Sequence, residues 1–224
     1  MGSVLEDPKL ESQLARLNAE SEGQDGAMGA FFSSLGDTPE PEGGRWPQIR
    51  AFLADKFVAL EPDKAAFCYL TCRALQARRV VEVGTSYGVS TLWLAKAVKD
   101  NGGGVVIATE YEPEKAKTAR ANFAEAGLAD LIELREGDAR ETLTSLEGPI
   151  DFVLMDIWGD IPRPAIELIA PHLRIGAVVC ADNTGGDRSE EYARYFAFVN
   201  DPNNGLRTLT LPFKGGFEFT VKVA

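Results

Sequence analysis

A glycine-rich turn stands where an apolar run gives way to a helical pattern. Residues 82–90 read Glu-Val-Gly-Thr-Ser-Tyr-Gly-Val-Ser and overlap the end of the apolar run 80–83. Glycines in a strand-to-helix turn let a ligand approach the backbone closely and leave amide hydrogens exposed at a helix N-terminus. Gly84 and Gly88 have the spacing G-x-x-x-G, which differs from the dinucleotide fingerprint G-x-G-x-x-G and disfavours NAD. The turn therefore predicts a small ligand with an anionic group.

Acidic residues follow the next two apolar runs. Glu110 directly follows the run 105–109. A carboxylate at the carboxyl edge of an open sheet can accept two hydrogen bonds from ribose hydroxyls. Asp138 follows the third run, where it can accept a hydrogen bond from an adenine amino group or cap the helix that begins there. Both interpretations of Asp138 stay open. Together the two acids favour a nucleoside ligand.

Three more oxygen-bearing side chains follow the fourth and fifth apolar runs. Asp156 closes the fourth run, and Asp182 and Asn183 close the fifth, just before a glycine pair that would let both side chains turn inward. A cluster of oxygen ligands suits a hard cation such as Mg²⁺. The alternative is that these residues cap helices or face solvent. The sequence thus predicts a cation site at the sheet edge that holds the nucleoside.

From residue 79 onward, short β-branched runs alternate with helical patterns. We expect strands at 80–83, 105–109, 131–134, 151–155, 177–181, 206–211 and 217–223. We expect helices between them at 90–99, 114–126, 140–146, 163–173 and 189–199. The last two strands are separated by only five residues, which suits an antiparallel hairpin. The expected fold class is α/β, a Rossmann-like doubly wound seven-stranded sheet with five parallel strands and a C-terminal hairpin.

Helical patterns also precede the first expected strand. Leucines spaced three and four apart predict an amphipathic helix over 4–18, and prolines open helical patterns at 47–60 and 62–76. Between them, residues 19–44 are rich in Gly, Ser, Glu and Pro, so they form either a mobile linker or lid or a short docked helix. We expect residues 1–45 to form an N-terminal segment and residues 46–224 to form the main domain.

Composition limits the partners and the compartment. The 224 residues include 23 Lys and Arg against 34 Asp and Glu, a net charge of −11, which has the wrong sign for binding nucleic acid. No apolar run reaches the roughly 18 residues of a membrane span, and the first residues lack the pattern of a secretory signal. Cys68, Cys72 and Cys180 match no zinc or disulfide pattern. We expect a cytoplasmic protein with reduced cysteines, no nucleic-acid partner and no membrane partner.

The order and spacing of four motifs resemble one enzyme family. The motifs are the run 81–84 with Gly88, the acid Glu110, the run 155–158 and the run 181–183. Together they resemble class I S-adenosylmethionine-dependent O-methyltransferases, particularly the small cation-dependent enzymes of the catechol and caffeoyl-CoA type. The resemblance covers approximately residues 65–223. It implies a methyltransferase domain with S-adenosyl-L-methionine and Mg²⁺ or another divalent cation as cofactors, acting on a small phenolic or enolic hydroxyl acceptor.

The same resemblance implies roles for individual residues. The cofactor-binding residues would be Glu82, Gly84, Thr85, Ser86, Gly88, Ser90, Glu110, Tyr111, Asp138, Ala139 and Asp156. The metal ligands would be Asp156, Asp182 and Asn183. Trp158 would form an aromatic wall for a planar acceptor, although packing is the commoner role of such a tryptophan.

One position departs from the family pattern. The family usually has a basic lysine three residues after the first metal aspartate, and here that position is Gly159. Two replacement bases can be named: Lys214, in the turn of the expected hairpin, and Asp160. The plainer interpretation of Lys214 is an exposed turn lysine. Without a base, the metal alone would have to activate an acidic phenol or enol, or the metal chemistry would have been lost.

Three other functions fit parts of the sequence. Ser86 lies in a G-x-S-x-G pattern and is followed by Asp156 and His172, the chain order of a serine hydrolase triad. The only histidine stands before three strands, however, whereas a hydrolase triad histidine follows the last strand. A metal-independent methyltransferase for carbon or nitrogen, or a catalytically idle cofactor-binding relative, would keep the nucleoside site. The leucine seam of residues 5–17 could also pair two subunits as a homodimer.

Overall fold

The structure is a computed structural model, and it describes residues 4–36, 44–185 and 189–224. By its internal contacts the chain divides into two compact units, Met1–Ala59 and Leu60–Ala224, and each is described by itself. The boundary expected after residue 45 stays a prediction.

The first unit is helical. Its helices are α1 (Pro8–Glu22), α2 (Asp25–Gly36) and α3 (Trp46–Leu53). Asp7 caps α1 by accepting a hydrogen bond of 3.2 Å from the amide of Leu10. Within residues 19–44, Asp25–Gly36 form a helix and residues 37–43 lie outside the described part, so the choice between a lid and a docked helix stays open.

The third helix ends earlier than its sequence pattern predicts, at Leu53 rather than residue 60. The amides of Phe57 and Ala59 donate to the side chains of Gln24 and Ser21, at 3.1 Å each, instead of continuing the helix. Side-chain acceptors 33 and 38 positions away in the sequence thus replace helical carbonyls in this segment.

The second unit is a sheet covered by helices. Its strands are β1 (Arg79–Val83), β2 (Val105–Glu110), β3 (Ile132–Glu136), β4 (Ile150–Met155), β5 (Leu173–Asp182), β6 (Leu206–Leu211) and β7 (Phe217–Lys222). Its α-helices are α4 (Pro62–Ala74), α5 (Val89–Asp100), α6 (Pro113–Ala126), α7 (Ala139–Thr142), α8 (Pro162–Ile169) and α9 (Ser189–Val199). Each expected strand is found within a few residues of its predicted bounds.

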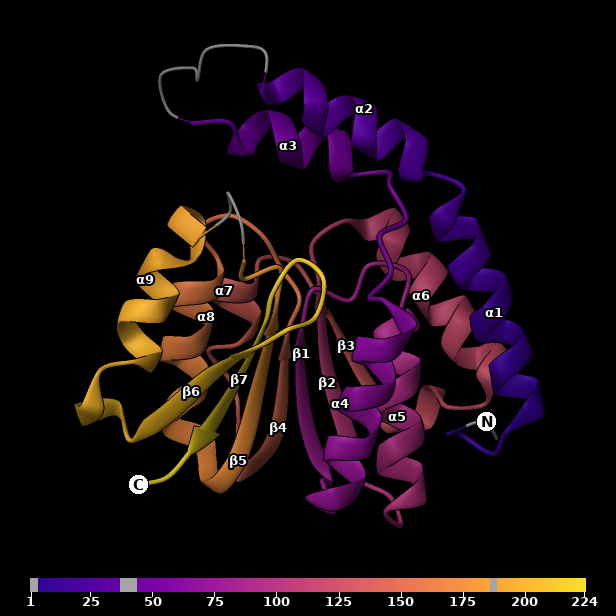
Figure 1. Ribbon diagram of the computed structural model, residues 1–224. Helices are drawn as coiled ribbons and strands as arrows, with labels where there is room; N and C mark the ends of the chain where they lie inside the picture. Colours follow the sequence, from indigo (N-terminus) through magenta and orange to yellow (C-terminus); the bar gives the residue numbers. More distant parts are fainter. Residues whose placement is uncertain (1–3, 37–43, 186–188) are drawn as a thin grey trace. The chain divides into compact units, whose positions relative to one another are not determined.

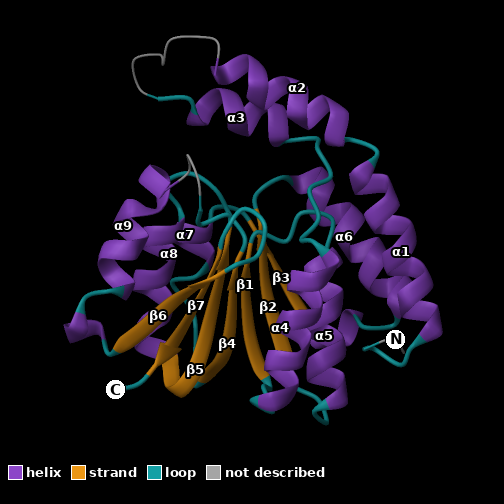
Figure 2. Ribbon diagram, in the orientation of Figure 1, coloured by secondary structure: helices purple, strands orange, loops and turns teal. Residues whose placement is uncertain are grey.

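The sheet has seven strands in the order β3-β2-β1-β4-β5-β7-β6. The pairs among β1 to β5 are parallel, whereas β7 is antiparallel to both β5 and β6. Helices α4 to α6 lie on one side of the sheet and α7 to α9 on the other (Figures 1 and 2). The predicted fold class, a doubly wound sheet closed by a hairpin, is confirmed.

Two helices of the second unit are shorter than their patterns predict. The pattern at 140–146 yields α7 over four residues, although Leu143 and Leu146 beyond it are buried in the core. The pattern at 163–173 yields α8, followed by a 3-10 turn over Ala170–His172. Pro171 has no amide hydrogen to donate to the preceding turn, so the α-helix ends before it. Apolar periodicity therefore predicts the buried residues more accurately than it predicts the residue at which a helix ends.

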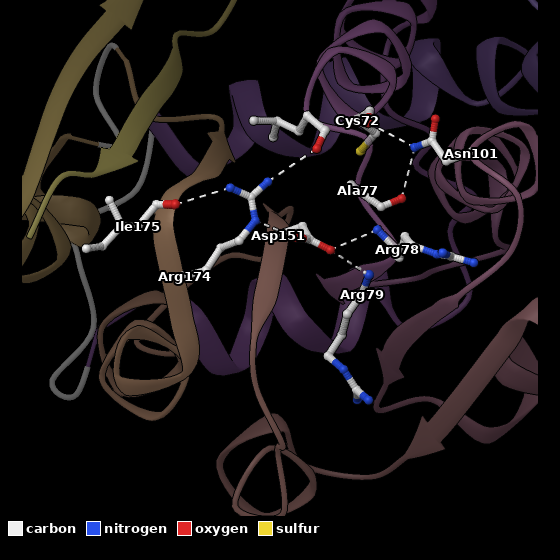
Figure 3. Close-up of polar contacts among 9 residues, drawn as sticks. Cys72, Ala77, Arg78, Arg79, Asn101, Asp151, Arg174 and Ile175 are labelled. Atoms are coloured by element: carbon white, nitrogen blue, oxygen red, sulfur yellow. Dashed lines mark hydrogen bonds and ion pairs between the residues drawn. The ribbon is translucent and has the colours of Figure 1, made fainter.

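The amino ends of the strands are joined by hydrogen bonds to one carboxylate (Figure 3). Asp151 accepts from the amides of Arg78 and Arg79, at 2.8 and 2.9 Å, and from Nε of Arg174 at 2.5 Å. Burial alone would raise the pKa of Asp151, but these donors outweigh it and lower the pKa below its usual value. Asp151 therefore connects β1, β4 and β5 at the edge opposite the candidate site.

Replacing Asp151 by alanine should lower stability without changing the candidate site. The substitution removes three hydrogen bonds to a charged acceptor, so we expect the free energy of unfolding to fall by about 2 to 4 kcal/mol. Urea unfolding measures this change. Calorimetric titration with S-adenosylhomocysteine should give an affinity within about twofold of wild type, and a large loss of affinity would contradict the separation of the two edges.

Candidate functional site

The carboxyl ends of β1 and β4 approach so closely that only glycine fits between them. Gly84 has a φ of +96°, and a Cβ there would lie 2.0 Å from the carbonyl oxygen of Asp156. Gly88 has a φ of +88°, and a Cβ there would lie 2.4 Å from the ring of Phe123. The turn that the sequence singles out therefore passes tightly over the sheet edge and leads directly into α5.

Beneath this turn lies a fully buried carboxylate, Glu82. Its Oε2 accepts from the hydroxyls of Thr85 and Thr91, and the hydroxyl of Ser90 also bonds to the carboxylate. Burial raises the pKa of Glu82 to about 7, although the three hydroxyl donors oppose the shift. Its Oε1 is buried and has no hydrogen-bond partner among the described residues. A buried unpaired acceptor of this kind marks a place for a ligand donor.

Glu110 lies at the carboxyl end of β2, as predicted, and is 8% exposed. Its Oε2 accepts from the amide of Ser86 at 2.6 Å, and its Oε1 accepts from the amide of Glu112 at 2.8 Å. Burial raises the pKa of Glu110, and the backbone donors together with the nearby Lys115 oppose the shift. The two amides fix the carboxylate beside the glycine-rich turn, and each oxygen retains a lone pair for a ligand hydroxyl.

Asp138 caps α7, so one of its two predicted roles is confirmed. Its Oδ1 accepts from the amide of Arg140 at 2.8 Å, and both of its oxygens bond to the Arg140 guanidinium. The amide of Gly137 donates to the carbonyl of Glu110 at 2.9 Å, which holds this loop next to the end of β2. Ala139 is buried in the first turn of α7, and Tyr111 is 47% exposed beside Glu110. Adenine contacts by these residues stay predictions.

Asp156 and Asp182 meet at the carboxyl edge, as the sequence predicts. The pKa of Asp156 is raised well above its usual range, first by burial and then by the charges of Asp182 and Glu82. Asp182 is 3% exposed, and its Oδ1 accepts from the amide of Asn183 at 2.7 Å. Its Oδ2 accepts from Nδ2 of Asn183 at 2.9 Å. Asn183 has a left-handed φ of +59°.

A lysine that is not among the residues singled out from the sequence joins this group. Lys64, in the first turn of α4, is 1% exposed, and its Nζ lies 2.6 Å from Oδ1 of Asp182. The same Nζ lies 2.9 Å from Oε2 of Glu61 and 5.9 Å from the ring centre of Phe217. Burial alone would lower the pKa of Lys64, but the charge and hydrogen bond of Asp182 outweigh it and raise the pKa. Lys64 is therefore a buried ammonium.

As arranged, these side chains do not fit a divalent cation. The Lys64 ammonium bonds to one oxygen of Asp182, and Asn183 directs its NH₂ group to the other, so it does not present its carbonyl oxygen beside the carboxylate. Magnesium needs oxygen ligands in a near-octahedral arrangement. In the described part of the chain, no group of three His, Cys, Asp or Glu residues could hold a metal ion. The metal roles of Asp156, Asp182 and Asn183 stay predictions.

The two candidate bases lie in the outer part of this edge. Asp160 has a side chain that is 64% exposed, and it lies 3.5 Å from the guanidinium of Arg140. Lys214 is exposed in the hairpin turn, which is held at the carboxyl edge by a 2.9 Å hydrogen bond from Gly185 to Gly215. The turn therefore emerges where the topology argument places it. A catalytic role for either residue stays a prediction.

Aromatic side chains border the Lys64 region, whereas the only aromatic residue expected from the sequence to contact the acceptor is Trp158. Phe67, Phe213 and Phe217 pack edge to face, with ring centres 5.4 to 6.0 Å apart. Phe67 comes from α4, Phe213 from the hairpin turn and Phe217 from β7. Trp158 is partly buried in the loop after β4, and its role as an acceptor wall stays a prediction. These three phenylalanines therefore connect α4 with the hairpin turn and β7.

The serine hydrolase alternative is wrong. Ser86 and Asp156 lie at the carboxyl edge, but His172 immediately precedes β5 and lies at its amino end. The ten residues of β5 separate His172 from that edge by about 3.3 Å each. The three side chains therefore do not meet.

Comparison with known proteins agrees with this geometry. Residues 81–184 match the family model of a methyltransferase domain. A protein of Mycobacterium sp. (strain JLS) that bears the name "Putative O-methyltransferase" is 32% identical over 157 residues, which are 67% of this chain and 69% of that protein. The chain belongs to the class I O-methyltransferases.

Two further relatives of this O-methyltransferase are informative. A catechol O-methyltransferase of Mycobacterium tuberculosis is 39% identical over 127 residues, which are 56% of this chain and 57% of that protein. The chain thus spans little more than half the length of this curated relative. The crystal structure of the O-methyltransferase from Bacillus cereus in complex with SAH superimposes with a TM-score of 0.66 and 26% identity, covering 78% of this chain and 87% of that one.

None of the helices in the described part of this O-methyltransferase is both long and apolar enough to cross a bilayer. Cys68, Cys72 and Cys180 are free and buried, as expected.

Proposed function

We propose that this O-methyltransferase transfers a methyl group from S-adenosylmethionine to the hydroxyl of a small phenolic or enolic acceptor. The observation that carries the proposal is the pair of buried carboxylates, Glu82 with an unpaired oxygen and Glu110, beneath the Gly84 turn at the carboxyl edge. A phenolic acceptor is supported by the name of the catechol O-methyltransferase relative and by the aromatic side chains of Phe67 and Phe213.

The residues beneath the turn match the polar groups of the cofactor. Oε1 of Glu82 would accept from the ammonium of the methionine portion, which supplies the hydrogen bond that this oxygen lacks. Glu110, held by the amides of Ser86 and Glu112, would accept from the two ribose hydroxyls. Asp138, at the end of the next strand, would lie near the adenine.

The protein would contribute to the reaction by binding the cofactor and the acceptor and aligning them with each other. When bound, S-adenosylmethionine supplies an electrophilic methyl group: the acceptor oxygen forms the new O–C bond, the S–C pair stays on sulfur, and the hydroxyl proton leaves to water. Glu82 would hold the methionine ammonium and Glu110 the ribose, so that the methyl group between them faces the acceptor side of the edge. Holding both reactants in line supplies much of the rate enhancement expected of such an enzyme.

The proposed function does not include the divalent cation that the family resemblance implies. The ammonium of Lys64 and the amide of Asn183 already bond to the carboxylate of Asp182. Magnesium could bind there only after both donors had moved away. A divalent cation could therefore take part in the reaction only if Lys64 left Asp182.

A methyl transfer assay tests the proposal. Incubation with cofactor carrying a labelled methyl group and with catechol should give labelled O-methyl catechol. Failure to bind S-adenosylhomocysteine in a calorimeter would contradict the cofactor assignment. Binding without transfer to catechol or to other phenols and enols would favour an idle relative, and label on carbon or nitrogen of an acceptor would favour the other class of methyltransferase.

The pKa of Glu82 predicts how cofactor affinity depends on pH. Because that pKa is about 7, the ionised fraction of Glu82 rises approximately tenfold between about pH 6 and about pH 8. Only the ionised form attracts the ligand ammonium, so affinity for S-adenosylhomocysteine should increase with pH over this range. In Glu82→Gln the affinity should be low and nearly independent of pH. Calorimetry at several pH values measures both, and parallel pH profiles would contradict the assignment of Glu82.

A further inference from the structure

The strongest unexplained feature of the acceptor side is a buried positive charge. Lys64 reaches from α4 to the carboxyl end of β5, where its Nζ lies 2.6 Å from Asp182 with both side chains almost fully buried. No step of the proposed function uses this lysine. The residues of the pair are 118 positions apart in the sequence, so the fold must bring them together.

A buried charge needs a compensating one. Asp156 and Asp182 are two acids at one sheet edge, and the charge of Asp182 raises the pKa of Asp156, so a cation beside them is needed to stabilise both ionised forms. In a metal enzyme the divalent ion supplies the compensating charge. Here the described residues supply it from α4, because the ammonium of Lys64 acts directly on Asp182 and also attracts Asp156.

The remaining contacts hold Lys64 at this place. Glu61, which immediately precedes α4 and stands three residues before Lys64, accepts a second bond of 2.9 Å, and the ring centre of Phe217 lies 5.9 Å away. Among the described residues, oxygen atoms therefore bond to two of the three N–H groups of the ammonium. Contacts with Glu61, with Asp182 of β5 and with Phe217 of β7 therefore fix the position of the Lys64 ammonium.

We propose that Lys64 is the resident cation of the acceptor site: it takes the place of the divalent ion at Asp182, so that this enzyme binds no divalent ion there and methylates its acceptor without one. This inference rests on the proposed function. Lys64 acts as a positioning residue, because it holds Asp182 and gives the acid pair its positive charge. It also accounts for Gly159, since a site without the metal has no need of the lysine that normally works beside it.

Binding of Mn²⁺, followed by electron paramagnetic resonance, tests the proposal without any acceptor. Wild-type protein saturated with S-adenosylhomocysteine should bind no Mn²⁺ at this site up to about 1 mM. Binding below about 1 mM that is lost in Asp182→Asn would overturn the proposal. The wild-type titration is decisive even if every Lys64 variant is unstable.

Removing the ammonium should create a metal site. Lys64→Met keeps the length of the side chain and frees both acids, so it should gain Mn²⁺ binding by at least about tenfold over wild type. Lys96→Met is the matched control, because Lys96 is also a buried lysine, paired with Asp100 at 2.6 Å in α5. It should gain no Mn²⁺ binding. A folded Lys64→Met protein that binds S-adenosylhomocysteine but not Mn²⁺ would contradict the replacement of an ion by Lys64.

Turnover separates this inference from the proposed function. With catechol as acceptor, wild-type kcat should be the same in EDTA as in Mg²⁺. Lys64→Met should lose about 100-fold in kcat in EDTA and recover part of it with Mn²⁺, while its affinity for S-adenosylhomocysteine stays within about threefold of wild type. Loss of wild-type turnover in EDTA and its return with Mg²⁺ would overturn the role of Lys64 and leave the proposed function standing. Absence of cofactor binding in wild type would overturn the proposed function itself.

Discussion

Gly84→Ala should abolish detectable binding of S-adenosylhomocysteine. An alanine Cβ would lie 2.0 Å from the carbonyl oxygen of Asp156, and the φ of +96° at this position is unfavourable for any side chain. The ends of β1 and β4 would have to separate, which displaces both the turn and Asp156. We expect the free energy of unfolding to fall by about 3 kcal/mol and the affinity to fall by at least about 100-fold.

Gly127→Ala is the matched control for that substitution. Gly127 ends α6 with a φ of +66°, but a Cβ there would meet no atom within 4 Å. The change therefore imposes the backbone strain without the collision, and it should cost about 1 kcal/mol of stability and leave cofactor affinity unchanged. Calorimetry and urea unfolding of the two variants measure the difference. Equal losses of affinity in the two variants would show that cofactor binding does not depend on the close approach of β1 to β4.

Glu110→Ala should weaken cofactor binding about 100-fold, because two hydrogen bonds to a charged acceptor would be lost. The loss should also loosen the glycine-rich turn, since Glu110 accepts the 2.6 Å hydrogen bond from the amide of Ser86. Adenosine alone should lose nearly as much affinity as S-adenosylhomocysteine, because the lost contacts are to the ribose. Titration of the variant with both ligands measures this.

Glu136→Ala is the control for Glu110. Glu136 is also an acid at the carboxyl end of a strand, β3, but it is exposed and pairs with Arg120 at 2.7 Å. Its removal should change affinity by less than about twofold. If Glu136→Ala weakened binding as much as Glu110→Ala, a general effect of negative charge at this edge would explain both losses, and the ribose contact would be refuted.

The sheet could be predicted from the sequence because its signals are local and strong. Runs such as 106–108 and 152–155 are buried and apolar throughout, as expected of a parallel strand that is covered on both faces. The short link between β6 and β7 leaves no room for a crossover helix, so the hairpin could be predicted as well. The bounds of α3 and α7 were harder to predict, because side-chain acceptors and loop packing decided where those helices end.

The positions of the site acids were predictable, but their partners were not. Strand ends place Glu82, Glu110, Asp156 and Asp182 at one edge through topology alone. Which cation lies beside Asp182 depends on a contact across 118 residues, to which no local pattern points. One signal was present: Lys64 stands four residues before Cys68, so it shares the buried face of α4. A lysine on a buried helix face needs an acid partner.

A crystal structure of this protein with S-adenosylhomocysteine tests the central claim most directly. We predict the ribose hydroxyls within hydrogen-bond distance of Glu110, the methionine ammonium at Oε1 of Glu82, and the sulfur facing the side of the edge where Lys64 and Asp182 form their ion pair. A nucleoside bound elsewhere, or bound at this edge with its ribose away from Glu110, would contradict the account.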